Sequence, residues 1–350
     1  MTPILQEDCR ALAHDDSLPW DALRGKAVVV SGATGLIGKT LVGAILARED
    51  DVPSGMTVCV LARKPAKALS LFPKSSALSI VSWDAAEARV GLEGITHADV
   101  IFHCANMTDS SSFVERPVEV IDTTVDGARA MLELARRTGS SVCLLSTMET
   151  YGEVSHEGAV REDQGGFLDT MVVRNSYPEA KRLDEAYAAA YASQYGVDAK
   201  VLRLSQTFGP GVPPDDNRVF AYFARCALQK KDIVMLTEGN KQNAYLYTAD
   251  AVRAALVVAM RGVCGRAYNA ANDETFCAVR DMAAMVADVF GAGKISVRFE
   301  LDAQAAARFR KGSVLRLDTS ALRALGWDPQ VGLQEMYRRM MRDWEFTQSV

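Results

Sequence analysis

The stretch AVVVSGATGLIG, residues 27–38, joins a short apolar run to a turn that contains three glycines. The run AVVVS (27–31) is rich in β-branched residues, which is typical of a buried strand. The segment KTLVGAILARED (39–50) follows with a helical pattern. A strand, a glycine turn and a helix in this order predict a phosphate-binding site at the start of the helix. Free backbone amides and the positive end of the helix dipole meet there.

The glycines of this turn follow the spacing GxxGxxG and not the commoner GxGxxG. We expect Gly32 to permit the tight turn, Gly35 to let a pyrophosphate approach the backbone, and Gly38 to let the helix pack closely on the sheet. The alternative is an ordinary strand–helix turn without a ligand. The cofactor-binding residues predicted from the turn are Gly32, Thr34, Gly35, Leu36, Ile37 and Gly38.

Strand-like and helical segments alternate along the rest of the first 205 residues. After the first strand, the predicted strands are 56–62, 77–81, 99–104, 141–146 and 199–204, and the predicted long helices are 117–137 and 178–195. This alternation predicts an α/β fold with a Rossmann-like, doubly wound parallel sheet and right-handed crossovers.

The pattern loosens after residue 206, which predicts a smaller C-terminal substrate-binding cap over the carboxyl ends of the strands. The expected division has three parts. They are an N-terminal leader with a short helix (1–26), an NAD(P)-binding Rossmann domain (27–205 plus 244–270), and the cap (206–243 plus 271–350).

The composition excludes several classes of partner. The 350-residue chain is 49% hydrophobic and has a net charge of −5, so we expect neither nucleic acid nor an anionic membrane as a partner. Its seven cysteines form no CxxC pair, so we expect reduced thiols and no metal. No uncharged apolar run reaches the roughly 18 residues of a membrane helix. The N-terminus lacks an apolar signal core, and a cytoplasmic location is therefore expected.

The end of the second predicted strand bears on the choice of nicotinamide cofactor. An acidic residue there binds a ribose 2′-hydroxyl, whereas an arginine suits a 2′-phosphate. The strand ends Leu61-Ala62-Arg63-Lys64, without a carboxylate, so Arg63 favours NADP. The alternative is a solvated basic turn. Asp84, just after the third strand, is a candidate partner for the adenine amino group.

Tyr177 and Lys181 lie four residues apart at the start of a predicted helix and therefore project from one face. A cation beside a phenol lowers the phenol pKa from about 10, which makes the tyrosine a candidate general base. The spacing YxxxK alone is weak, because it occurs by chance in many chains. In combination with the glycine turn and with Thr147 at the end of the fifth strand, it becomes specific.

Five segments together resemble the extended short-chain dehydrogenase/reductases, and among them the nucleotide-sugar epimerase/dehydratase family. The likeness is strongest to UDP-glucuronate decarboxylases and dTDP-glucose 4,6-dehydratases. The matching segments are SGATGLIG (31–38), FHCAN (102–106), LLSTMETYG (144–152), RNSYPEAKR (174–182) and LRLSQTFGPG (202–211).

This resemblance implies roles for individual residues. Thr147 is the hydroxyl that bonds the reacting sugar oxygen, Tyr177 is the base, and Lys181 holds the nicotinamide ribose. Ala105 in FHCAN lies at the cofactor. The resemblance further implies a tightly bound NAD or NADP, a nucleotide-diphosphate sugar substrate, and a homodimer in which helices 117–137 and 178–195 form a four-helix contact.

Glu149 carries the finer prediction. Dehydratases of the family have Thr-Asp-Glu where this chain has Thr147-Met148-Glu149. The retained Glu149 predicts proton chemistry at C5 of the sugar, whereas the missing aspartate argues against a standard 4,6-dehydration. The alternative role for Glu149 is a structural carboxylate.

The chain departs from the family at the substrate side as well. Gln206 replaces an asparagine, and Asn243 stands where an arginine near the diphosphate is usual. Arg218 and Arg316 are therefore the candidate phosphate contacts, each against the alternative of a surface arginine. His103 is expected to be structural and not catalytic.

The expected activity is transient oxidation of the sugar at C4, with NAD(P) regenerated within the cycle. Epimerisation, dehydration and decarboxylation remain open, and a plain C4 dehydrogenase is an alternative. A non-catalytic NAD(P)-sensing protein is the alternative of another class. The presence of Thr147, Tyr177 and Lys181 argues against it.

Overall fold

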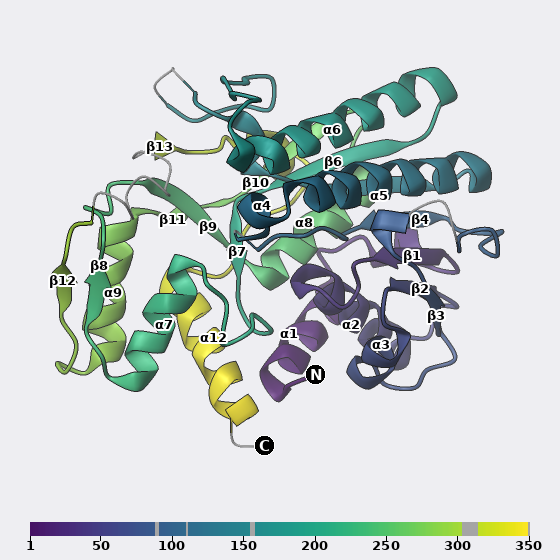
Figure 1. The fold of residues 1–350 in the computed structure, drawn as a ribbon. Helices are drawn as coiled ribbons and strands as arrows, with labels where there is room; N and C mark the ends of the chain where they lie inside the picture. Colours follow the sequence, from purple (N-terminus) through teal and green to yellow (C-terminus); the bar gives the residue numbers. More distant parts are fainter. Residues whose placement is uncertain (88–90, 110, 155–157, 303–313, 349–350) are drawn as a thin grey trace.

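A seven-stranded parallel sheet forms the centre of the molecule (Figure 1). The structure is a computed structural model that describes residues 1–87, 91–109, 111–154, 158–302 and 314–348. The strand order is β10-β6-β5-β4-β1-β2-β3, so the chain winds outward from β1 in both directions. The predicted doubly wound, Rossmann-like fold is confirmed. The strands are β1 (Ala27–Ser31), β2 (Thr57–Ala62), β3 (Leu78–Ser82), β4 (Val100–His103), β5 (Ser141–Thr147), β6 (Ala199–Leu204) and β10 (Ala267–Ala270).

The central strands are buried on both faces, which explains their continuous apolar runs. In β1, Val28 and Val30 point into one hydrophobic core and Val29 into the other, because successive side chains alternate across a strand. The same alternation separates Val142 from Cys143 in β5. The sheet therefore needs helices on both faces.

Two pairs of helices supply this cover. Helices α5 (Pro117–Thr138) and α6 (Ser176–Tyr195) pack on one face, and α2 (Leu36–Asp51) and α8 (Thr248–Arg261) on the other (Figure 1). Helix α6 begins two residues before the predicted start, because Pro178 fits within the first turn, where its missing N–H is not needed. No helix in the described part of the chain is long and apolar enough to cross a bilayer.

The short helix expected in the N-terminal leader is α1 (Pro3–Ala13), and it packs against α2 and α8. Leu5 and Leu12 are buried, and Asp8 accepts hydrogen bonds from Tyr247 and from Arg339, on α12 (Leu333–Gln348). The segment is thus integrated into the core between two later parts of the chain.

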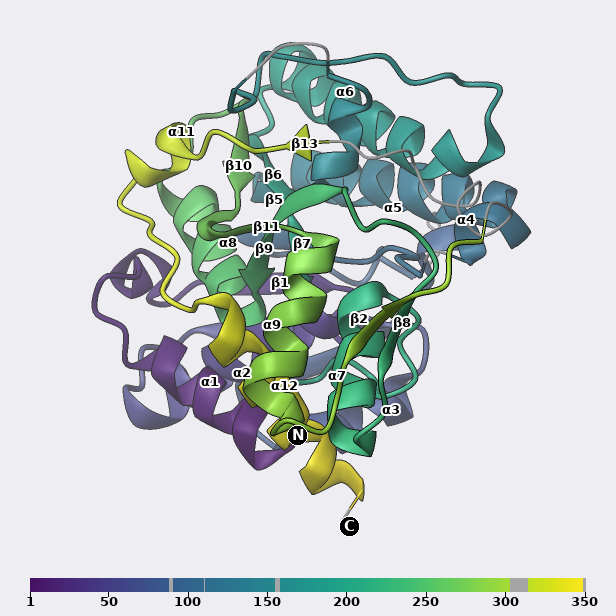
Figure 2. The same ribbon diagram turned by 90° about the vertical axis from the view of Figure 1, so that its left-hand side faces the viewer.

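The smaller part carries two further sheets, which Figure 2 shows from the side. Strand β9 (Gln242–Tyr247) pairs with β7 (Gln206–Phe208), β11 (Asn272–Ala278) and β13 (Val314–Leu315), and β8 (Ile233–Met235) pairs with β12 (Val297–Phe299). Residues 244–247 thus belong to a small sheet, whereas β10 joins the large one. The other elements are η1 (Trp20–Leu23), α3 (Pro65–Leu71), η2 (Ala85–Glu87), α4 (Ser112–Glu115), η3 (Met148–Tyr151), η4 (Val173–Asn175), α7 (Val219–Gln229), α9 (Val279–Gly291) and α11 (Ser320–Arg323).

Candidate active site

One large cavity of about 2570 Å³ lies between the carboxyl ends of the central strands and the cap. Its volume exceeds the roughly 300–1,000 Å³ of a typical small-molecule pocket, so it has room for two large ligands side by side. The predicted residues that line it are Gly32, Gly35, Leu36, Ile37, Gly38, Thr147, Glu149, Tyr177, Lys181, Gln206 and Arg218.

The glycine turn forms a cradle that side chains would fill. Gly32 has a φ of +65°, and a Cβ on it would lie 2.5 Å from the backbone nitrogen of Ala105. A Cβ on Gly38 would lie 2.4 Å from the carbonyl oxygen of Gly32. Helix α2 begins at Leu36 without a side-chain cap, so the amides of its first turn remain free for an anion. This geometry fits the pyrophosphate of a dinucleotide.

Tyr177 and Thr147 come together from different elements. Thr147 ends β5, and its hydroxyl accepts a hydrogen bond from the Glu149 amide at 3.3 Å. Tyr177, in the first turn of α6, is 7% exposed, and the nearby Thr147 side chain lowers the pKa of its hydroxyl. The Tyr177 ring stacks on Phe113 with a centroid distance of 4.3 Å and an interplanar angle of 8°. These contacts fix the position of the phenol oxygen.

The expectation that Lys181 lowers the pKa of Tyr177 is wrong for this structure. Burial raises the pKa of Tyr177, the charges of Glu149 and Asp184 raise it further, and the Thr147 hydrogen bond and Arg174 only partly oppose them. Burial is the largest cause of this raised pKa. The Lys181 ammonium is paired within the protein, since its Nζ lies 3.1 Å from Oδ2 of Asp184.

Glu149 faces a cation that the sequence-based site did not include. Its carboxylate lies 3.0 Å and 3.2 Å from the two terminal nitrogens of Arg174. The Arg174 guanidinium lies 4.6 Å from the centroid of the Phe113 ring. The same ring stacks on Tyr177. Arg174, Phe113 and Tyr177 therefore form one packed layer beside Glu149.

Several predicted cofactor contacts lie away from the cavity lining. Arg63 is exposed directly after β2, and Thr34 is half-buried in the glycine turn. The Asp84 carboxylate accepts a hydrogen bond from the amide of Ala86 at 3.1 Å and so caps η2. Ala105 contributes backbone that packs on Gly32. The cofactor roles of these four residues remain predictions.

The predicted substrate residues separate in space. Gln206 begins β7 and lines the cavity. Arg218 also lines it, and its guanidinium is 2.6 Å from Asp216. Arg316 is exposed and lies 3.3 Å from Asp273, outside the cavity lining. The structure therefore brings Gln206 and Arg218, but not Arg316, to the cavity that Tyr177 also lines.

His103 is fully buried at the end of β4, and its Nδ1 lies 2.7 Å from the Ser31 hydroxyl. Burial, together with the charge of Lys181, lowers the pKa of His103 to about 3. The ring is therefore neutral, as a structural residue at a strand end would be.

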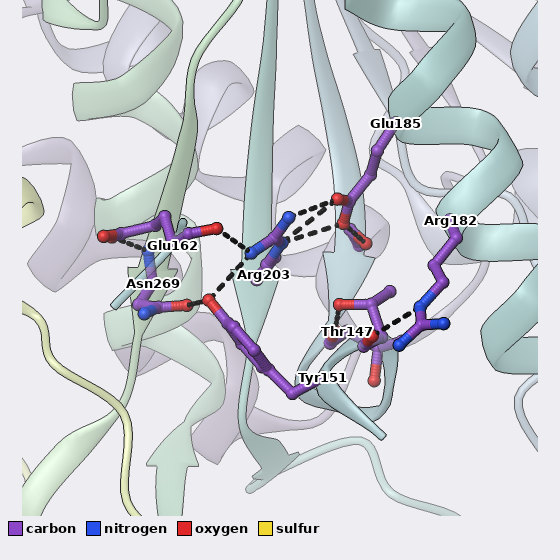
Figure 3. A network of polar contacts seen from close by, with 9 residues as sticks. Thr147, Tyr151, Glu162, Arg182, Glu185, Arg203 and Asn269 are labelled. Atoms are coloured by element: carbon purple, nitrogen blue, oxygen red, sulfur yellow. Dashed lines mark hydrogen bonds and ion pairs between the residues drawn. The ribbon is translucent and has the colours of Figure 1, made fainter. Parts of the chain in front are cut away.

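A buried polar network holds the turn that carries Glu149 (Figure 3). Arg203 on β6 makes an ion pair of 2.6 Å with Glu185 and donates to the Tyr151 hydroxyl at 2.8 Å. Tyr151 in turn donates to Asn269 at 2.6 Å. Because burial raises the pKa of Tyr151 to about 12, its hydroxyl stays protonated and remains a donor. The network anchors η3 to β6 and β10.

A second anchor lies on the α6 side of the same turn. The Arg182 Nε donates to the carbonyl of Thr150 at 2.7 Å, and its Nη2 donates to the carbonyl of Gly166 at 2.7 Å. Figure 3 shows Arg182 on the helix side of Thr147 and Arg203 on the opposite side. The turn from Thr147 to Tyr151 is therefore held from both directions.

Three of these residues were missed by sequence reasoning. Arg174 lies in the segment RNSYPEAKR, three residues before Tyr177, so the sequence could have predicted its position near the site. Phe113 and Arg203 had no comparable signal, because their contacts with Tyr177 and Tyr151 arise only when distant elements pack together.

Residues 28–271 match the model of the NAD dependent epimerase/dehydratase family. The chain therefore belongs to this family, and the resemblance found in the sequence motifs is confirmed. UDP-glucuronic acid decarboxylase 1 of Xenopus tropicalis is 31% identical over 238 residues, which cover 68% of this chain and about half, 54%, of that protein. UDP-glucuronic acid decarboxylase 3 of Arabidopsis thaliana is 27% identical over 325 residues, which cover 92% of this chain and 90% of the relative.

Solved structures share the fold. The UDP-glucose 4-epimerase of Thermotoga maritima, in complex with UDP-glucose, gives a TM-score of 0.77 at 22% identity and covers 92% of this chain and 99% of its own. The dTDP-glucose 4,6-dehydratase of Streptomyces venezuelae, with NAD bound, gives 0.76 at 23% identity, with coverages of 92% and 98%. At these identities the likeness is one of fold.

We predict that Tyr151→Phe destabilises the protein by about 1–3 kcal/mol, because Arg203 and Asn269 each lose a buried hydrogen-bond partner. Urea denaturation measures this loss. The matched control is Tyr195→Phe, whose hydroxyl is in contact with Gln194 on a side chain that is 51% exposed. Its effect should stay below about 0.5 kcal/mol. Equal effects of the two variants would contradict the anchoring role.

Proposed function

We propose that this protein is an enzyme that converts a nucleotide-diphosphate sugar by transient oxidation at C4 of the sugar. The observation that carries this proposal is that Thr147 and Tyr177 line the same cavity as the glycine turn, with the Thr147 side chain close enough to the phenol to lower its pKa. A proton-transfer group and a phosphate cradle thus share one chamber. A protein that only senses NAD(P) would have no use for the paired hydroxyls.

Gly32, Gly35 and Gly38 would hold the dinucleotide through free amides and close backbone approach, and Lys181 would bind its nicotinamide ribose. When bound, the oxidised nicotinamide supplies a positive charge and a hydride acceptor, and it later returns the hydride. The pyrophosphate cradle and Lys181 lie on the same cavity, which supports this arrangement.

Tyr177 would take the proton of the sugar 4-hydroxyl and give it back at the end of the cycle. Thr147 would hydrogen-bond the same sugar oxygen and stabilise the phenolate, since its hydroxyl lowers the pKa of Tyr177. The stack on Phe113 holds the ring during both transfers. No net proton is consumed by this residue in a full cycle.

Oxidation at C4 makes the C5 hydrogen acidic, and Glu149 would be the carboxylate that removes it. Arg174 favours a second candidate function. A guanidinium on the cavity wall attracts an anionic sugar, and a uronate oxidised at C4 is a β-keto acid that loses carbon dioxide. The names of the two decarboxylase relatives support the same candidate.

The experiment that tests the proposal is incubation of the protein with a panel of UDP-, dTDP- and GDP-sugars, with products identified by mass and NMR. Loss of water indicates dehydration, loss of carbon dioxide indicates decarboxylation, and an unchanged mass with altered stereochemistry indicates epimerisation. No conversion and no cofactor reduction with any member of the panel would overturn the enzymatic proposal.

We predict that Tyr177→Phe lowers turnover by at least about 100-fold, in line with general-base contributions of about 10²–10⁴. The variant should fold and bind cofactor normally, because the ring keeps its stack on Phe113. Tyr195→Phe, at the far end of the same helix, should retain turnover. Near-normal turnover of Tyr177→Phe would exclude this residue as the base.

Glu149→Gln should still reduce the bound nicotinamide but stall before the later step. Removing the carboxylate charge also lowers the pKa of Tyr177, so the first oxidation is not impaired. Reduced nicotinamide should accumulate by absorbance, and solvent deuterium should not enter the sugar. Glu153→Gln, an exposed carboxylate on the same cavity, should show neither effect. Normal turnover of Glu149→Gln would confine the chemistry to C4.

The cofactor preference is tested at Arg63. We predict that NADP binds at least as well as NAD, and that Arg63→Ala weakens NADP binding by about tenfold, because a charged hydrogen bond is worth about 1.5–3 kcal/mol. NAD binding should not change. Calorimetric titration measures both, with Lys74→Ala as a control for loss of an exposed charge. A clear preference for NAD would show that Arg63 points away from the ribose.

A homodimer through α5 and α6 is the proposed assembly. Val118, Ile121, Leu183 and Tyr195 are large apolar or aromatic side chains exposed on these two helices. Light scattering at micromolar concentration should report a dimer, and Leu183→Lys should shift it toward the monomer. Val263→Lys, an exposed apolar position after α8, is the control. A monomeric wild type would refute the contact.

A further inference from the structure

Lys181 is a buried ammonium whose contacts are already made within the protein. Its Nζ donates to the carbonyl of Leu145 at 2.9 Å and lies 3.1 Å from Oδ2 of Asp184. Lys181 and Asp184 are each 2% exposed. These contacts use two of the three N–H donors of the ammonium. Both ends of the pair are therefore excluded from solvent.

Tyr177, Lys181 and Asp184 form one stripe of α6, at the spacing i, i+4, i+7 that faces the sheet. Ala188 continues the stripe with a small apolar side chain. Asp184 thus occupies a position where an apolar residue would pack without penalty. Among the described residues, its Oδ1 has no hydrogen-bond partner, although the atom is buried. A half-satisfied buried carboxylate is costly, which argues for a role beyond packing.

The titratable groups around the Lys181–Asp184 ion pair add no unpaired charge to it. At the end of β4, burial keeps His103 neutral and raises the pKa of the adjacent Cys104 thiol, so neither adds charge. On α6, burial raises the pKa of Asp184 to about 6 although Lys181 lowers it. Glu185 raises this pKa further, but Glu185 is itself paired with Arg203. On η3 and η4, Glu149 is paired with Arg174.

We infer that Asp184 is a positioning residue that fixes the Lys181 ammonium against the Leu145 carbonyl and cancels the effect of its charge on Tyr177. The inference rests on the proposed role of Tyr177 as the proton-transfer group. The phenol is then buried without an unpaired cation beside it among the described residues, and its protonated form predominates. Its activation requires positive charge from another source, so proton transfer is confined to the loaded site.

The direct test measures the ionisation of Tyr177 without recourse to turnover. Protein labelled with ¹³Cζ-tyrosine has ten tyrosines, and the Tyr177 signal is the one lost in Tyr177→Phe. Its chemical shift is followed from about pH 7 to about pH 11. In Asp184→Asn the unmasked ammonium should increase the phenolate fraction at a given pH by at least about tenfold, since a nearby opposite charge shifts a pKa by about 1–3 units.

The matched control uses Lys200, which is the other buried lysine among the described residues. Lys200 pairs with Asp198 and donates to the carbonyl of Ala259 at 3.1 Å, but the Asp198 side chain is 47% exposed and lies outside α6, just before β6. Asp198→Asn should leave the Tyr177 titration unchanged. A shift as large as that of Asp184→Asn would overturn the inference.

A second variant keeps the test decisive if Asp184→Asn does not fold. Lys181→Met with Asp184→Asn removes both charges and leaves neutral side chains of similar size, which buried positions tolerate. If the pair is balanced, the Tyr177 titration of this double variant stays within about half a unit of wild type. A rise of about one unit or more means that Lys181 acts on Tyr177 uncompensated, and the inference is then wrong.

Turnover supplies an independent readout once a substrate is identified. The acidic limb of the pH profile of kcat/KM should move to lower pH in Asp184→Asn, by the same amount as the phenol titration. A profile that keeps its position while the rate falls indicates a merely structural role and overturns the inference. Failure of every sugar in the panel would refute the proposed function but leave the NMR result on Asp184 valid.

Discussion

The close contact between the glycine turn and the end of β4 is the constraint on which the site depends. A side chain at Gly32 would collide with the backbone of Ala105, and one at Gly38 would collide with the carbonyl of Gly32. These approaches let α2 start directly above the sheet and leave its first amides open to the cavity. Because the strands are parallel, the ends of β4 and β5 meet at the same edge, and Thr147 arrives beside the cradle.

Three cations on the cavity wall each lie against a carboxylate. Arg174 lies on Glu149, Lys181 on Asp184, and Arg218 on Asp216. An anionic ligand that approaches one of these cations competes with a carboxylate already in place. The uncapped amides of α2 have no such competitor and are the more accessible anion site. This pairing explains how an acidic chain accommodates phosphates without a strongly basic pocket.

The residues that hold the site in place do not themselves line the cavity. Arg203, Glu185 and Asn269 hold Tyr151 from the sheet, and Arg182 holds the carbonyl of Thr150 from α6. The turn between them carries Glu149. The proposed role of Glu149 requires a carboxylate held in a precise position, and here two elements fix the residues around it.

The sequence by itself determined the sheet, the cradle and the order of the chemical groups. Apolar runs and the glycine spacing are local patterns, and YxxxK reports its own geometry because a helix places i and i+4 on one face. Only the tertiary structure determined which charged groups form pairs and which groups are buried. Burial reversed the expected pKa shift of Tyr177, and Lys181 is paired with Asp184. Phe113 and Arg203 contact Tyr177 and Tyr151 from distant segments of the chain. It also separated Arg316 from the cavity. The physical reason is that burial and charge pairing depend on which elements pack together, and local sequence carries no record of that.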